Sequence, residues 1–229
     1  MRRATLALCL VALAAAACGS SKVRSRSYYT LAYALTDEER LAPAPRVPVM
    51  LRVKELDVEL SYDRQPIVYR YSPYQLEFYQ YHQWIAKPQR MLTELIYKHL
   101  KHANVFRQVT TSLKEGLPDY ELEGQVRNIE EFDSDTEWSA HLAMTLQVVD
   151  TRTRRLVWRH DFDQRRKVFN HDVIYVVRAL SQILEEEMGR VAPSLEAALV
   201  RDLAARPAPS RVEDGAGAAD VPATGSPER

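Results

Sequence analysis

The sequence lacks the short motifs that commonly mark an enzyme or a nucleotide-binding site. It contains no G-x-S-x-G, no G-x-G-x-x-G, no phosphate-binding G-x-x-x-x-G-K and no C-x-x-C. Only seven glycines occur in 229 residues, so the glycine-rich loops that cradle phosphates have little material to form from. We therefore predict that the protein is not an enzyme and has no catalytic residue, no cofactor and no metal site.

Neither sign of charge is in excess. The chain has 31 lysines and arginines against 31 aspartates and glutamates. A nucleic-acid-binding protein needs a clustered basic face, and no such excess exists here. We therefore expect no nucleic-acid partner.

Cysteine is also scarce, and its placement is informative. After Met1-Arg2-Arg3 comes an almost uncharged run, 4–17, which contains Cys9 and is followed by Cys18. A basic start, a short apolar core and small residues are typical of a secretory signal peptide, and the run is too short to span a bilayer of about 30 Å. Once residues 1–17 are removed, Cys18 is the only cysteine left and has no disulfide partner. An odd cysteine in an exported chain needs another explanation.

The end of this signal resembles a bacterial lipobox, in which the cysteine becomes the acylated first residue of a lipoprotein. Leu13 and Ala16-Ala17 fit, whereas Ala15 stands where leucine is commonest. The resemblance implies lipidation of Cys18, a lipidated tether over 18–27, and outer-membrane sorting because no aspartate follows the cysteine. The alternative is an ordinary secretory signal in which Cys18 has no role.

The spacing of hydrophobic residues predicts the secondary structure of the rest of the chain. Period-2 alternation predicts strands at 47–53, 67–71, 74–79, 104–109, 120–132, 138–148 and 156–162, with a bulge near Arg127-Asn128. Helical spacing predicts a helix that has Pro88 in its first turn and a last helix capped by Asn170 or Asp172 and broken or kinked at Pro193. The predicted fold is α/β (α+β): one domain over 28–205, with a mixed, mainly antiparallel sheet and two helices packed on one face. The tail 206–229 has almost no large apolar residues and is predicted to be disordered.

Two groups of polar residues are predicted to be solvated surface. The acidic runs 130–135 and 185–187 are expected in a loop and on an exposed helix face, where paired carboxylates do no acid–base chemistry. His99 and His102 lie three apart on a helix and could share a metal ion, but we expect two solvated side chains.

Tyrosine is abundant: twelve occur, against five phenylalanines. Because tyrosine joins an apolar ring to a polar hydroxyl, it suits half-buried and contact surfaces. Many of the tyrosines lie in one predicted hairpin, which we expect to form part of a partner-contact face. Its predicted contact residues are Tyr69, Tyr71, Tyr74, Tyr79 and Trp84.

The order of short patterns resembles a known family. After Cys18 come Y-Y-x-L at Tyr28–Leu31, I-V-Y-R at Ile67–Arg70, W-x-x-x-P at Trp84–Pro88 and V-F-x-x-V at Val105–Val109. Over about 18–200 the chain resembles the ABC-type transport auxiliary lipoproteins, which include the paraquat-inducible protein C lipoproteins. Ala15 and the tail after Arg206 depart from the family pattern.

The resemblance implies a lipoprotein anchored in the outer membrane, facing the periplasm, that assists an MCE-type ABC transport system. Such systems move phospholipids or other hydrophobic molecules between membranes. The implied partners are MCE-domain proteins and their ABC transporter complex, with homo-oligomer formation possible by analogy. The alternative is a regulatory or assembly lipoprotein that acts on a cell-wall synthase or an outer-membrane assembly machine.

Overall fold

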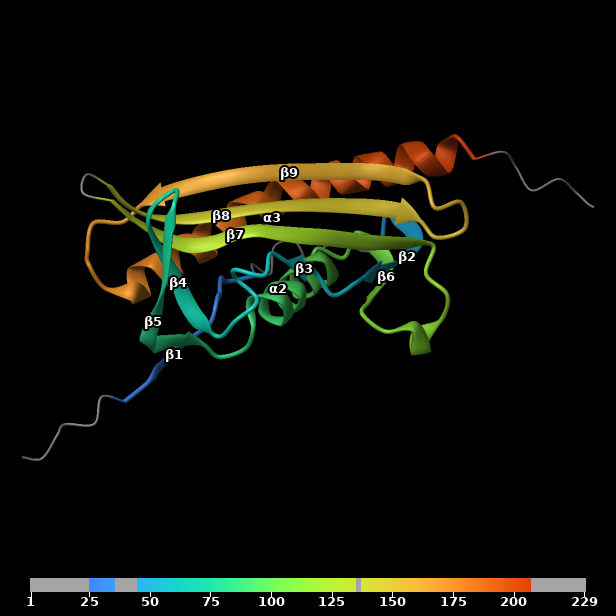
Figure 1. The fold of residues 1–229 in the computed structure, drawn as a ribbon. Coiled ribbons are helices and arrows are strands. Elements are labelled where there is room, and N and C mark those ends of the chain that lie inside the picture. The colour runs from blue at the N-terminus through green and yellow to red at the C-terminus, as the bar shows by residue number, and fades with distance from the viewer. Residues whose placement is uncertain (1–24, 36–44, 135–136, 207–229) are drawn as a thin grey trace, which may run out of the picture.

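The computed structural model describes residues 25–35, 45–134 and 137–206 (Figure 1). In these ranges nine strands form one mixed sheet, and two α-helices accompany it. The strands are β1 (Ser27–Tyr29), β2 (Val47–Val53), β3 (Asp57–Val58), β4 (Pro66–Ser72), β5 (Gln75–Trp84), β6 (Phe106–Thr110), β7 (Tyr120–Ser134), β8 (Glu137–Asp150) and β9 (Leu156–Lys167). The helices are α2 (Pro88–His102) and α3 (Val173–Ala204), and a 3-10 turn, η2, spans Leu113–Glu115. The predicted signal peptide, Cys18 and the tail after Arg206 lie outside the described residues.

Strand β7 is the centre of the sheet. One of its edges pairs antiparallel with β8 from Tyr120 to Ser134, and β9 continues this meander. The other edge is shared, in order along β7, by β2, β3 and β4, and these three pairings are short and parallel. As a result β7 joins two outer groups of strands, β2–β6 at one end of the molecule and β4–β5–β1 at the other (Figure 1).

The predicted bulge in β7 is confirmed. Its pairing with β8 shifts register between Val126 and Asn128, which makes Arg127 the extra residue. The insertion changes the phase of the alternation, so that Val126 and Ile129 both reach the core. The guanidinium of Arg127 donates to the carbonyl of Phe162 in β9, at 3.0 Å.

Both helices cover the same face of the curled sheet, as predicted. α3 packs on β8 and β9, α2 packs on β2, β3 and β6, and their apolar side chains join one core with the inward residues of the strands. Leu92 and Ile96 of α2 and Leu180 and Leu184 of α3 are completely buried. Each such side chain contributes about 1.5–3 kcal/mol relative to exposure. No helix within the described ranges is both long and apolar enough to cross a membrane.

The helix starts follow the predicted signals, but α3 is not broken at Pro193. Pro88 occupies the first turn of α2, and the Asp172 carboxylate accepts the N–H of Ile174 at the start of α3. Instead of stopping at Pro193, α3 continues through it to Ala204. The proline leaves the carbonyl of Gly189, four residues earlier, without its helical donor. Both residues are exposed, so water can satisfy that carbonyl and the helix need not end.

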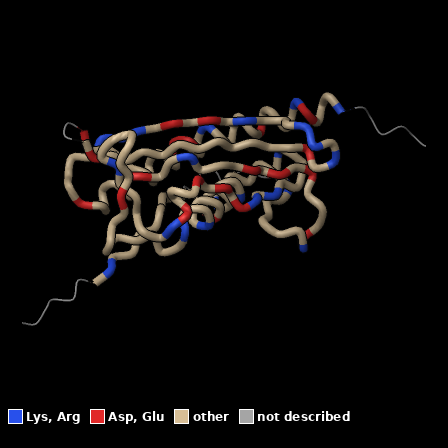
Figure 2. Tube along the Cα trace, viewed as in Figure 1, with Lys and Arg blue, Asp and Glu red and all other residues tan. Residues whose placement is uncertain are grey.

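The outer face of the sheet is polar. Arg52 of β2 pairs with Glu121 of β7 at 2.8 Å, and Lys54 pairs with Glu123 at 2.9 Å. Figure 2 shows both signs of charge interspersed along the molecule. Between β2 and β7, this face therefore carries cross-strand ion pairs.

Candidate functional site

The candidate site is the β4–β5 hairpin, which forms where the sequence predicted a tyrosine-rich hairpin. Its turn is Pro73-Tyr74, and Ser72 pairs with Gln75 across it. The hydroxyl of Ser72 accepts the N–H of Tyr74 at 3.3 Å, which supports the turn. β4 then pairs with β7, and β5 pairs in parallel with β1. The hairpin is thus held between the central strand and the N-terminal strand.

The aromatic rings of the hairpin contact one another in series. The ring centroids of Tyr69 and Tyr71 lie 5.2 Å apart, and those of Tyr69 and Tyr79 lie 4.6 Å apart. The Tyr79 ring meets His82 at 5.1 Å, and the hydroxyl of Tyr29 in β1 lies 2.7 Å from Nδ1 of His82. Centroid distances of 4.5–7 Å are those of favourable aromatic pairs, so this row of rings is a packed surface.

Two tyrosine hydroxyls of this row donate to carboxylates. Tyr69 donates to Glu77 at 2.6 Å, and this hydrogen bond raises the pKa of Tyr69 while lowering the pKa of Glu77. Tyr79 donates to both oxygens of Glu131, at 3.0 and 3.1 Å. Burial, followed by the charge of Glu131, raises the pKa of Tyr79. Both hydroxyls therefore serve as hydrogen-bond donors that fix the rings in place.

Glu131 lies behind the row of rings. It is 2% exposed, and the indole N–H of Trp138 donates to it at 2.6 Å. Burial raises the pKa of Glu131 in spite of the donors Trp138 and Tyr79. The carboxylate fixes the hairpin to β7 and β8 through these two bonds.

The five predicted contact residues differ in exposure. Tyr74, at the turn, is 98% exposed and Tyr71 is 45% exposed, whereas Tyr69 and Tyr79 are half-buried. Trp84 is 1% exposed and belongs to the core, so its side chain is not on the surface. The indole anchors the end of β5 instead, and we remove Trp84 from the contact face.

The other face of the hairpin meets a polar cluster that the sequence did not reveal. Glu130 is 1% exposed and accepts from Tyr62 at 2.6 Å and from Nε of Arg70 at 2.9 Å. Nδ1 of His141 lies 3.1 Å from Glu130, and its Nε2 lies 2.8 Å from Asp163. Burial alone would raise the pKa of Glu130, but the bonds from His141, Tyr62 and Arg70 outweigh it and lower that pKa.

The expectation of solvated residues in the acidic runs and at His99 is therefore wrong for particular residues. Glu130 and Glu131 lie in β7 and not in a loop, and both are buried. Glu187 of α3 is 2% exposed and lies 2.9 Å from His160. His99 is 6% exposed and lies 3.1 Å from the hydroxyl of Tyr33. A run of acidic letters does not reveal these partners, which come from distant segments.

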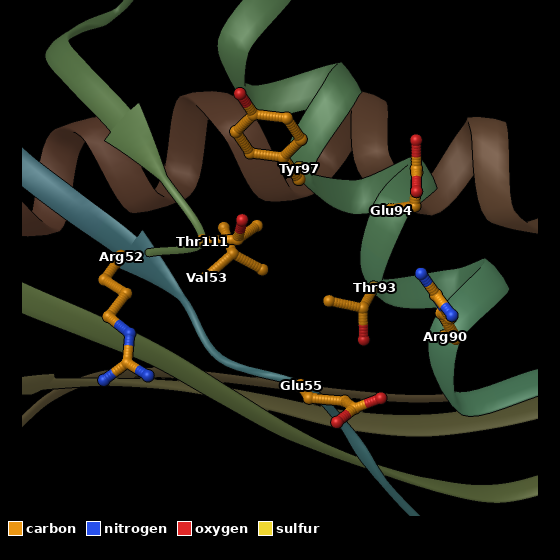
Figure 3. A pocket seen from close by; sticks show the side chains of 8 residues that line it. All are labelled: Arg52, Val53, Glu55, Arg90, Thr93, Glu94, Tyr97 and Thr111. Atoms are coloured by element: carbon orange, nitrogen blue, oxygen red, sulfur yellow. The ribbon is translucent and has the colours of Figure 1, made fainter. Parts of the chain in front are cut away.

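A cavity of about 530 Å³ opens between α2 and the end of β2 (Figure 3). The Thr93 hydroxyl accepts the N–H of Leu56 at 3.0 Å and donates to the carbonyl of Gln89 at 2.8 Å. The Arg52 guanidinium donates to Glu121 and points away from the other side chains of the view (Figure 3). Thr93 thus holds α2 to the segment after β2, and Arg52 holds β2 to β7. In the described ranges, no group of three or more His, Cys, Asp or Glu side chains could hold a metal ion.

The site lies beside the strand at which the described chain begins. Ser25 is the first described residue, and β1 follows it along β5. Six residues lie between Cys18 and Ser25, so the two Cα atoms are at most about 25 Å apart when the segment is fully extended.

Comparison with known proteins agrees with this description. Among solved structures, protein XCC0632 from Xanthomonas campestris, of the family DUF330, aligns with a TM-score of 0.67 and 19% identity over 78% of this chain and 99% of its own. An uncharacterised protein aligns with a TM-score of 0.58 and 16% identity over 75% of this chain and 99% of its own. No curated protein matched. The family described as ABC-type transport auxiliary lipoprotein component matches residues 29–192. The resemblance inferred from the short patterns is thus confirmed, and the chain belongs to the ABC-type transport auxiliary lipoprotein components.

Proposed function

We propose that this lipoprotein is anchored in the outer membrane through Cys18, faces the periplasm and assists an MCE-type ABC transport system that moves phospholipids or other hydrophobic molecules. The family match carries the transport role. The exposed rings of Tyr71 and Tyr74, beside half-buried Tyr69 and Tyr79, support a contact face for an MCE-domain protein. The hairpin is suited to this because its backbone is paired on both sides while its turn stays exposed.

A photo-crosslinking amino acid at Tyr74 tests this proposal in cells. We expect an adduct with an MCE-domain protein, because the side chain is 98% exposed at the tip of the hairpin. The matched control is Leu117, which is 91% exposed in the segment before β7, at the opposite end of the molecule, and should give no such adduct. Recovery of only a peptidoglycan synthase or an outer-membrane assembly protein from Tyr74 would replace this function by the regulatory or assembly role.

The anchor is tested by Cys18→Ala. We expect the variant to lose membrane attachment, because the acyl chains, at about 0.8 kcal/mol per buried CH₂, supply the binding. Fractionation of the envelope measures this. Cys9→Ala is the matched control, since Cys9 would leave with the signal peptide, and it should fractionate like the parent chain. Unchanged membrane association of Cys18→Ala would refute the anchor.

A further inference from the structure

A groove runs between α2 and the N-terminal arm, which we define as residues 30–35. The backbone N–H of Leu31 lies 3.3 Å from Sδ of Met91, and the Tyr33 hydroxyl lies 3.1 Å from Nδ1 of His99. Met91 and His99 are about two helical turns apart, so the arm follows α2 in the same direction. The arm and the helix form the two walls of the groove.

One end of the groove is apolar. A cavity of about 210 Å³ lies there; its apolar lining is Leu31, Ile85, Ala86, Met91 and Leu95, and its polar rim is Thr30, Arg90, Glu94 and Lys98. Leu31 and Met91 are buried, Leu95 is partly buried, and Ile85 is 59% exposed. A molecule that covers the exposed side chain of Ile85 would therefore be stabilised by about 25 cal/mol for each Å² of apolar surface removed from water.

The other end of the groove is basic. A second cavity, of about 480 Å³, lies near the C-terminal end of α2 and is lined by Leu35, Lys98, Lys101, His102 and Asn104. Lys98 lines both cavities, so they are neighbours along one groove. The helix C-terminus favours cationic side chains there.

Two cations that line the groove, Arg90 and Lys98, are weakly compensated by the described residues, whereas Lys101 donates to the Tyr97 hydroxyl at 3.1 Å. Arg90, at the apolar end, makes no side-chain hydrogen bond or ion pair with the described residues. Lys98 pairs with Glu94 at 3.0 Å, but the two side chains are 57% and 58% exposed. An exposed pair of this kind contributes about 0.2–1 kcal/mol, so an incoming anion can compete with Glu94 for Lys98.

We propose that the groove binds an anionic amphiphile with one hydrocarbon chain, the chain lying against Ile85, Met91 and Leu95 and the phosphate or carboxylate meeting Lys98 and Lys101. The apolar cavity is smaller than the roughly 300–1,000 Å³ of common ligand sites, which favours one chain over two. The inference rests on the proposed function, because it assigns to this chain direct contact with a hydrophobic cargo of that system.

Isothermal titration of the chain from Gly19 onward, which retains every described residue, tests the proposal. The probes are dodecyl phosphate, dodecyl maltoside and dodecyltrimethylammonium, each below its micelle concentration. We expect saturable binding of dodecyl phosphate at least tenfold tighter than that of the neutral or cationic probe. Absence of saturable binding, or equal affinity for the three headgroups, would overturn the proposal.

Two pairs of variants locate the site. Ile85→Glu should weaken dodecyl phosphate binding at least fivefold, whereas Leu113→Glu, at a 54% exposed leucine of η2, should leave it unchanged. Lys98→Glu should weaken it by a similar factor, with Lys114→Glu as its control. All four positions are exposed, so the variants should fold. Equal affinities within either pair would place the binding elsewhere.

The outcome is separable from that of the proposed function. If the crosslinker at Tyr74 captures an MCE-domain protein while dodecyl phosphate does not bind, only the groove proposal is wrong. If dodecyl phosphate binds as expected but Tyr74 captures a different machine, the proposed association with an MCE-type system is wrong. If Ile85→Glu abolishes capture of a protein partner and no amphiphile binds, the groove is a protein contact.

Discussion

Glu130→Ala is expected to destabilise the folded chain by about 3–5 kcal/mol, the range for breaking a buried ion pair. Glu130 accepts from Tyr62, Arg70 and His141, and the side chains of Glu130 and His141 are 1% and 5% exposed. Removing the carboxylate leaves the Tyr62 hydroxyl, the Arg70 guanidinium and the His141 ring without their shared acceptor in a largely buried site. Because Arg70 lies in the hairpin and His141 in β8, the loss also loosens the hairpin from the central strands. Urea unfolding followed by circular dichroism measures the change.

The neighbouring glutamate supplies the matched control. Glu130→Gln should cost about 3 kcal/mol by leaving Arg70 without its counter-charge, whereas Glu131→Gln should change stability by less than about 1 kcal/mol. Glu131 is held by two neutral groups, Trp138 and Tyr79, and a glutamine amide can accept from the indole and donate to the hydroxyl. Equal losses for the two variants would contradict the distinction between a cationic and an aromatic environment.

The contributions of Glu130 and Glu131 to folding stability are expected to depend on pH in opposite directions. The pKa of Glu130 is lowered in the folded state, so its contribution to stability is present above the unfolded value of about 4.5 and is lost as the pH falls through the folded pKa. The pKa of Glu131 is raised, so its contribution is largest below about 4.5 and decreases as the pH rises through the folded pKa. Consequently, the loss of unfolding free energy caused by Glu130→Gln should become smaller as the pH falls below 4.5. Over the same pH change, the parent chain should become more stable relative to Glu131→Gln.

The elements that the sequence predicts correctly depend on local signals. The helix at Pro88, the cap at Asp172 and the bulge at Arg127 are each determined by residues that are close to them in the sequence. The family resemblance is also local, because it follows the order of short patterns such as that at Trp84–Pro88. Fold class and family could therefore be inferred without coordinates.

The site was less accessible to sequence reasoning because its geometry is set by parallel pairings between distant segments. Nothing in the alternation of β4 says that Tyr69 pairs with Glu131. Without knowledge of that register, the acidic run 130–135 is predicted to be a solvated loop. In the structure, Glu130 accepts a hydrogen bond from Arg70 and Glu131 accepts one from Tyr79. The burial of Trp84 was hidden for the same reason, since it depends on where β1 and the helices pack.

Gly124→Val is expected to destabilise the chain by about 3 kcal/mol, the upper end for overpacking of a core. Gly124 lies in the first half of β7, and a Cβ there would meet Cδ2 of Leu56 at 2.7 Å, Cδ2 of Leu146 at 2.8 Å and the carbonyl oxygen of Thr145 at 2.9 Å. The leucines could shift only within a filled core, and the carbonyl belongs to the paired strand β8, so the clash cannot be relieved by a side-chain rotation alone. Valine adds two further methyl groups at the point where the chain crosses from β2 to β3.

The matched control is Gly189→Ala in α3, where a Cβ would meet no atom within 4 Å. Alanine has a higher helix propensity than glycine, by about 0.8–1 kcal/mol, so this variant should be more stable than the parent chain. The midpoints of urea unfolding should therefore move in opposite directions for the two substitutions. A Gly124→Val chain as stable as the parent would mean that β7 and the β2–β3 connection can separate without loss. That result would contradict the close packing of Leu56 and Leu146 against Gly124.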